Sequence, residues 1–161
     1  MSVKKVLLLC GVPGSGKSYW AKNDFMYNAD RTAYISRDEV RYSMITDNDE
    51  YFSKENAVFA EFVRRINAAI DDPEITSIIV DATHLNWASR NKILRKLHLS
   101  NADVIPVVFN LPLKVCLERN EQREGRAKVP TNVICRMYSQ YTDPGTDPFE
   151  YSNIIRYGGE I

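Results

Sequence analysis

The residues with the most specific chemical signature form the segment Gly11-Val12-Pro13-Gly14-Ser15-Gly16-Lys17-Ser18. Its spacing fits GxxxxGK[ST], a pattern in which backbone N–H groups converge on the phosphates of a nucleotide. An apolar run at 6–10 precedes the segment and a helical pattern follows it, which is the strand, loop and helix order that the motif requires. The alternative is a glycine-rich turn that holds no ligand. We expect a phosphate-binding loop made of Gly11, Pro13, Gly14, Ser15, Gly16, Lys17 and Ser18.

This loop predicts a nucleotide as the phosphate donor. Lys17 is expected to contact the β- and γ-phosphates of ATP, or of another nucleoside triphosphate, and the Ser18 hydroxyl to ligate Mg²⁺. Gly14 and Gly16 allow the backbone to turn its N–H groups toward one point.

A carboxylate and a guanidinium follow the second expected strand, in the segment Ser36-Arg37-Asp38-Glu39-Val40-Arg41. Asp38 and Arg41 are three residues apart at the start of a helix, so they share one face. Phosphorylation of a hydroxyl needs a carboxylate that orients this hydroxyl and accepts its proton, and a cation suits a charged acceptor. The alternative is that Asp38 only begins the helix, with Arg41 as its solvated ion-pair partner.

A second acidic residue, Asp81, ends the third expected strand. An acid after a hydrophobic strand is the Walker-B arrangement, which holds a Mg²⁺-bound water or orients the loop below the acceptor. Asp81 and Thr83 are therefore candidates for the acceptor side, and a hydrogen-bonded turn is the alternative for Asp81. His84 is not predicted to bind a metal, because no second ligand stands at a suitable spacing.

Three arginines occur in the segment 112–130, which we expect to form a lid. Arg119 and Arg123 lie four residues apart on one helical face, and Arg126 follows Gly125, which can end the helix. Like charges placed in this way repel each other unless an anion lies between them, and the donor triphosphate is such an anion. The alternative is a solvated basic helix paired with its own glutamates.

Apolar runs alternate with helical patterns along the whole chain, which predicts one α/β domain over 1–161: a doubly wound, mostly parallel sheet of about five strands with helices on both faces. The expected strands are 5–10, 32–36, 77–80, 103–109 and, more weakly, 153–157. The expected helices are 17–26, 38–45, 54–70, 86–98, 112–123 and 130–141. The ligand of such a sheet binds at the carboxyl ends of its strands.

Composition limits the possible partners. The 161 residues include 21 basic and 21 acidic side chains, so binding of nucleic acid would depend on local patches. The apolar run near the N-terminus is too short for a signal peptide or a membrane span, which predicts a cytoplasmic protein without membrane contact. Cys10, Cys116 and Cys135 are expected to be small buried side chains without disulfides or metal.

As a set, GVPGSGKS, SRDEVR, IIVDATHLN and RNEQREGRAKVP, followed by residues 133–138, resemble the kinase domain of the phage-type polynucleotide 5′-kinases and their AAA_33-like bacterial relatives. The resemblance covers roughly 4–141. It implies that Lys17 and Ser18 hold the phosphates and Mg²⁺ and that Asp38 is the general base. It further implies that Arg41 grips the phosphate on the 3′ side of the accepting nucleotide, that Asp81 supports the acceptor site, and that Arg119 and Arg123 contact the donor.

Two departures from that family stand out. The spacing from Arg123 to Pro130 is one residue longer than in the phage enzyme, so Arg126 either adds to the lid or replaces one of its members. The chain also has no DxDGT-type motif, so we expect no 3′-phosphatase activity.

The leading hypothesis is ATP-dependent phosphorylation of a polynucleotide 5′-hydroxyl, RNA or DNA, with a role in nucleic-acid repair. The alternatives are a small-molecule or toxin-type kinase acting on a sugar, nucleoside or nucleotide-sugar hydroxyl, and a non-catalytic nucleotide-binding module.

Overall fold

Buried apolar runs form the strands of one parallel sheet. The computed structural model describes residues 3–24 and 30–158, apart from the side chains of residues 24 and 126. The strand order is β2-β3-β1-β4-β5, and every neighbouring pair is parallel. The strands are β1 (Lys4–Cys10), β2 (Thr32–Ser36), β3 (Ser77–Asp81), β4 (Ala102–Phe109) and β5 (Ile155–Tyr157). The predicted parallel α/β fold is confirmed.

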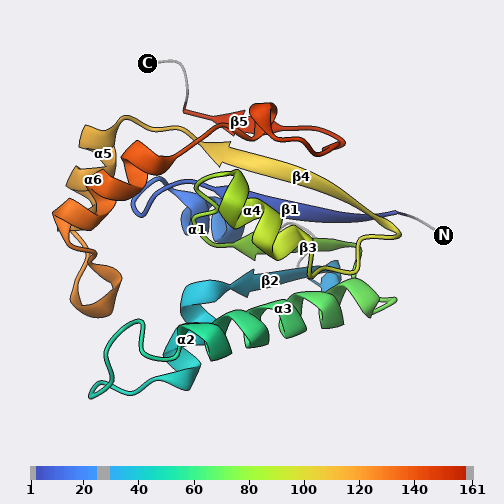
Figure 1. Ribbon diagram of the computed structural model, residues 1–161, viewed down its shortest axis with the longest axis horizontal. Helices are drawn as coiled ribbons and strands as arrows, with labels where there is room; N and C mark the ends of the chain where they lie inside the picture. The colour runs from blue at the N-terminus through green and yellow to red at the C-terminus, as the bar shows by residue number, and fades with distance from the viewer. Residues whose placement is uncertain (1–2, 25–29, 159–161) are drawn as a thin grey trace.

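Helices cover both faces of this sheet (Figure 1). The α-helices are α1 (Lys17–Tyr19), α2 (Arg37–Met44), α3 (Glu55–Asp71), α4 (Trp87–Leu94), α5 (Leu113–Glu121) and α6 (Thr131–Gln140). A π-helical turn, η1 (Trp20–Asp24), continues α1, and the 3-10 turns η3 (Gly125–Ala127) and η4 (Pro144–Thr146) follow α5 and α6.

The side chains of β1 divide the core into two layers. Val6 and Leu8 point to the face that α3 and α4 cover, where they pack with Phe62 of α3. Leu7 and Leu9 point to the other face, against η1 and the residues of β3 and β4 that face the same way. This alternation is the period-2 pattern of a strand buried on both sides.

Two expected helices differ from the structure at their ends. The helix expected at 86–98 stops at Leu94, because the chain then makes two tight turns: Lys96 N donates to Ile93 O, and Leu97 N to Leu94 O. The helix expected at 17–26 becomes π-helical from Trp20, and residues 25–26 lie outside the described part of the chain.

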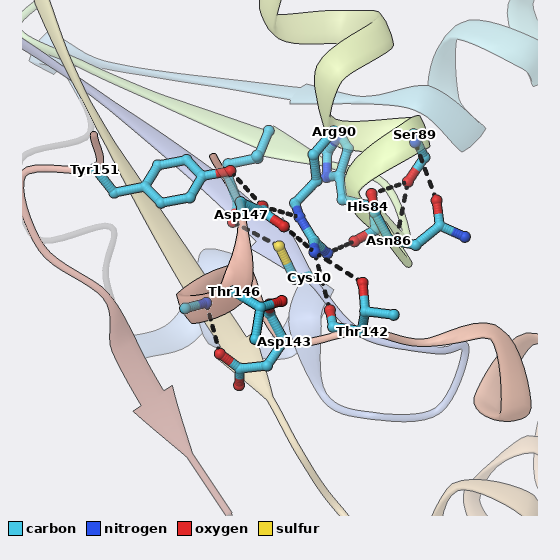
Figure 2. A network of polar contacts seen from close by, with 12 residues as sticks. Cys10, His84, Asn86, Ser89, Arg90, Thr142, Asp143, Thr146, Asp147 and Tyr151 are labelled. Carbon is cyan, nitrogen blue, oxygen red and sulfur yellow. Dashed lines mark hydrogen bonds and ion pairs between the residues drawn. The ribbon is translucent and has the colours of Figure 1, made fainter. Parts of the chain in front are cut away.

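A buried guanidinium joins α4 to the segment that follows α6 (Figure 2). Arg90 is fully buried, with Nε 2.7 Å from Asp147 Oδ2 and Nη2 3.0 Å from Asp147 Oδ1. Its Nη1 donates to the His84 carbonyl at 2.8 Å, and its Nη2 to the Thr142 carbonyl at 2.9 Å. The Tyr151 hydroxyl donates to Asp147 Oδ2 at 2.6 Å. Arg90 thereby fixes the loop after β3 and the chain on its way to β5.

The loop after β3 is fixed again at His84, which has a positive φ of 42°. The buried imidazole lies with Nδ1 2.6 Å from the Leu9 carbonyl oxygen. Because a carbonyl only accepts, Nδ1 carries the proton. Burial lowers the pKa of His84 to about 4, so the ring is neutral at physiological pH. One residue earlier, the Thr83 carbonyl accepts from Gly11 N at 2.9 Å, so this loop lies directly on the end of β1.

Replacing Arg90 with alanine leaves the buried Asp147 carboxylate without its counter-charge. We expect Arg90→Ala to lower the free energy of unfolding by about 3–5 kcal/mol, measured by urea denaturation. The matched control is Arg64→Ala, because Arg64 is 67% exposed in its ion pair with Glu61 and this loss should stay below about 1 kcal/mol. Equal losses in the two variants would show that the Arg90 pair does not fix the fold.

His84 makes stability depend on pH. The unfolded chain protonates this imidazole near pH ~6.5, whereas the folded chain resists protonation down to about pH 4. The unfolded state therefore binds more protons in this window, and the free energy of unfolding falls as the pH drops from ~6.5 toward 4. Asparagine tolerates a positive φ. His84→Asn should therefore remove this part of the decrease in the free energy of unfolding, and the surface variant His98→Asn should retain it. Parallel pH profiles for the parent and His84→Asn would refute this origin.

Candidate active site

The phosphate-binding loop adopts a backbone that only glycine fits at two positions. Gly14 and Gly16 have φ angles of 84° and 98°. A Cβ on Gly14 would lie 2.5 Å from the Cys116 carbonyl oxygen, and one on Gly16 would lie 3.3 Å from Arg119 Nη1. The loop thus packs against α5, and this contact brings the first arginine of the expected lid to the loop.

Polar groups inside the loop are free to meet a ligand. The buried Ser15 Oγ has no hydrogen-bond partner within the described residues. Lys17 Nζ donates to the Val12 carbonyl at 3.2 Å, within the loop itself. Gly11 directly follows β1, and Pro13 lies in the turn that comes next. An orphaned buried hydroxyl and a buried ammonium in one loop fit a polyphosphate, because an anion satisfies both.

Charges from other elements act on Lys17. Burial lowers the pKa of this lysine, the nearby carboxylates of Asp81 and Asp38 raise it, and the guanidinium of Arg123 lowers it. The charges that act on the lysine of the loop thus come from Asp38 near the start of α2, from Asp81 at the end of β3 and from one arginine of the expected lid.

Asp81, at the end of β3, connects the loop to β2. Ser18 Oγ donates to Asp81 Oδ2 at 2.8 Å, and the Tyr34 hydroxyl donates to the same oxygen. Burial raises the pKa of Tyr34, which keeps this hydroxyl protonated as a donor. A serine hydroxyl beside a carboxylate is a set of hard oxygen ligands that fits Mg²⁺, which proteins bind through one or two such groups together with phosphate oxygens. Thr83 lies on the same edge, two residues after Asp81.

Asp38 and Arg41 meet at the start of α2. Ser36 caps this helix, its Oγ accepting from Glu39 N at 3.3 Å. Arg41 Nη1 donates to Asp38 Oδ1 at 2.5 Å, while the side chain of Asp38 remains 61% exposed. The Tyr51 hydroxyl also donates to Asp38 Oδ1, at 2.8 Å. Within the described residues these hydrogen bonds use Oδ1, so Oδ2 is the oxygen left for a ligand.

The buried Arg41 has further partners from the start of α3. Its Nε and Nη2 donate to the two carboxylate oxygens of Glu55, at 3.1 and 2.6 Å, and Arg37 Nη2 reaches Glu55 Oε1 at 2.9 Å. Burial raises the pKa of Glu55, but the hydrogen bonds and charges of the two arginines outweigh it and hold this pKa below its usual value. Arg41 Nη1 also donates to the Tyr51 hydroxyl, so the guanidinium is held on three sides.

The expected lid is anchored by a residue that sequence reasoning missed. The buried Asn120 clamps the backbone of Val129, with Nδ2 donating to Val129 O at 2.6 Å and Oδ1 accepting from Val129 N at 2.9 Å. Arg123 Nη1 donates to the Ala127 carbonyl at 3.4 Å across this loop. The backbone of Arg126 lies in η3, and its side chain is outside the described part of the chain.

Tyr34, Tyr51 and Glu55 were also missed. They approach Asp81, Asp38 and Arg41 from other elements, at sequence separations of 47, 13 and 14 residues. No local spacing signals such contacts.

Sequence comparison relates this chain to a known family and to known proteins. The AAA_33 family, described as an AAA domain, matches residues 6–144. An L-seryl-tRNA(Sec) kinase of Methanococcus maripaludis is 26% identical over 147 residues, covering 88% of this chain and 54% of that protein. A putative bifunctional polynucleotide kinase/RNA ligase of Autographa californica nuclear polyhedrosis virus is 26% identical over 165 residues, covering 93% of this chain and 22% of that protein. This chain thus spans about half or less of the length of these relatives.

A solved structure shares the fold. A chain of the Pnkp1/Rnl/Hen1 RNA repair complex superposes with a TM-score of 0.73 at 24% identity, covering 87% of this chain and 44% of that chain. No helix within residues 3–24 and 30–158 is long and apolar enough to cross a membrane. Together with the phosphate-binding loop and the parallel sheet, these matches identify the chain as a member of the AAA_33 family with the fold of a P-loop kinase.

Proposed function

We propose that this protein transfers the γ-phosphoryl group of ATP to the 5′-hydroxyl of a polynucleotide. The observation that carries the proposal is the position of Asp38. It follows β2 at the sheet edge where the phosphate-binding loop follows β1, and its exposed carboxylate touches the Arg41 guanidinium. A base, a donor-binding cation and an acceptor-binding cation are thus gathered at one edge of the sheet. The likeness to a viral polynucleotide kinase/RNA ligase supports a polynucleotide as the acceptor.

The donor side has the groups that phosphoryl transfer requires. The backbone N–H groups of the loop and the Lys17 ammonium bind the phosphates, and Arg119 and Arg123 add positive charge from the lid side. Ser18 and Asp81 would hold Mg²⁺, which supplies charge neutralisation at the β- and γ-phosphates when bound. Positioning and charge neutralisation account for most of the rate in this chemistry.

On the acceptor side, Asp38 aligns the hydroxyl. A carboxylate with a reference pKa of about 4 cannot deprotonate an alcohol outright. In a loose transition state the proton moves late, so the base mainly directs the acceptor oxygen toward the γ-phosphorus. Tyr51 and Arg41 hold Asp38 Oδ1 and thereby turn Oδ2 to the acceptor. Arg41, whose own orientation Glu55 fixes, supplies the charge for the phosphate on the 3′ side of the accepting nucleotide, and Asp81 and Thr83 line the acceptor from the end of β3.

A transfer assay tests the proposal. The protein is incubated with labelled ATP and Mg²⁺ against 5′-OH RNA, 5′-OH DNA and a panel of sugars, nucleosides and nucleotide sugars. We expect label on the 5′-OH strands. Asp38→Asn should lower turnover by at least about 10²-fold at unchanged ATP affinity, because it loses the proton acceptor and keeps the donor site.

Two outcomes would contradict the proposal. Label on a small hydroxyl compound with none on either strand would make the protein a small-molecule kinase. A loss of ATP binding in Asp38→Asn, with transfer per bound ATP retained, would place Asp38 in the donor site.

A further inference from the structure

Phe52 is a large apolar side chain that the fold leaves 61% exposed, in the connection between α2 and α3. Unlike the exposed tyrosines Tyr19, Tyr138 and Tyr157, it has no polar group in its side chain. A single exposed apolar residue is ordinary on a protein surface. Phe52 differs from an ordinary exposed residue in the side chains that surround it.

These neighbours are residues of the proposed acceptor site. The rings of Phe52 and Tyr51 have centroids 4.6 Å apart at an interplanar angle of 84°. Tyr51 donates to Asp38 Oδ1 through its hydroxyl, and Arg41 Cζ lies 5.4 Å from the centre of the Phe52 ring. Tyr51 and Arg41 thus each lie beside the exposed ring and bond the candidate base.

The Phe52 ring meets Tyr51 edge to face and remains largely exposed beside Arg41. Tyr51 is held by hydrogen bonds to Asp38 and from Arg41, and it meets Phe52 edge to face. These contacts with Tyr51 and Arg41 restrain the Phe52 ring before any ligand arrives, which reduces the conformational entropy lost on binding. In Figure 1 the connection that carries both rings lies at the same end of the molecule as the α5–α6 segment, beyond the carboxyl ends of the strands.

We propose that the Phe52 ring, braced by Tyr51, stacks on a nucleobase of the acceptor strand. This inference rests on the proposed function, because it takes the molecule whose hydroxyl reaches Asp38 to be a polynucleotide. Every base offers a π-face, so stacking on an aromatic side chain binds a strand without selecting its sequence. Arg41, beside the same ring, provides the charge that the adjoining phosphate needs.

The test combines a ring deletion with base deletions. Phe52→Leu keeps an apolar side chain and removes the ring. We measure KM and kcat on a 5′-OH hexanucleotide and on six versions of it, each with one abasic position. Loss of stacking should raise KM for the intact strand by roughly 5- to 150-fold in Phe52→Leu, with kcat and the KM for ATP unchanged. For the parent protein, one of the six abasic strands should show a KM raised by a similar factor. On that strand, Phe52→Leu should have the same KM as the parent.

Two further variants complete the design. Phe52→Trp retains a ring and should keep the parent KM. Tyr157→Leu removes an exposed ring from β5, at the opposite edge of the sheet from β2, and should leave acceptor KM unchanged.

The stacking proposal is wrong if Phe52→Leu leaves KM unchanged, or if it raises KM by the same factor on the intact strand and on all six abasic strands. Altered sedimentation of Phe52→Leu with an unchanged KM would also overturn it, because the ring would then serve a contact between proteins. Failure of the proposed function has a separate signature: the parent protein itself would label no strand, whatever residue stands at position 52.

Discussion

The candidate active site depends on the register of three parallel strands. Leu8 of β1 and Ile35 of β2 both lie opposite Val80 of β3, and Ser36 lies opposite Asp81. The three strands therefore end at one edge, where their continuations become the phosphate-binding loop, the start of α2 and the loop at 82–86. Because β3 lies between its neighbours, Asp81 accepts hydrogen bonds from Ser18 on one side and from Tyr34 on the other. A shift of β2 by one residue against β3 would turn Tyr34 to the other face of the sheet, away from Asp81.

The polar and charged groups on the two sides of this edge differ in how they are paired. On the donor side, Lys17 and the buried Ser15 hydroxyl bond only within the loop or have no partner among the described residues, which suits a site that receives a highly charged ligand. On the proposed acceptor side, Arg41 is already held by Glu55 and Asp38, so its charge is oriented rather than free. The chain has equal numbers of acidic and basic residues. This balance is compatible with strong local charges, because oppositely charged side chains pair with each other.

Sequence reasoning predicted the fold, which the structure confirms, and it proposed the site groups whose signal is local. The glycines of the loop, Lys17 and Ser18 follow from one fixed spacing, and the five strands follow from apolar runs between turn residues. It missed Tyr34, Tyr51, Glu55 and Asn120, because each acts through a contact that only the folded chain creates. The π-helical turn after α1 was missed for a related reason: the apolar pattern there continues as in an α-helix, whereas packing of Trp20 against Phe109 and Tyr157 is set by tertiary structure.

Two small acceptors test most directly whether Arg41 binds an acceptor phosphate beside the hydroxyl that Asp38 holds. The efficiency of transfer, kcat/KM, is measured for a nucleoside 3′-monophosphate and for the matching nucleoside, with the parent protein and with Arg41→Ala. A charge-assisted hydrogen bond predicts a parent preference of roughly 10- to 150-fold for the 3′-monophosphate, and a ratio near one in Arg41→Ala even if both rates fall. Equal efficiencies with the parent, or a preference that survives in Arg41→Ala, would contradict the account.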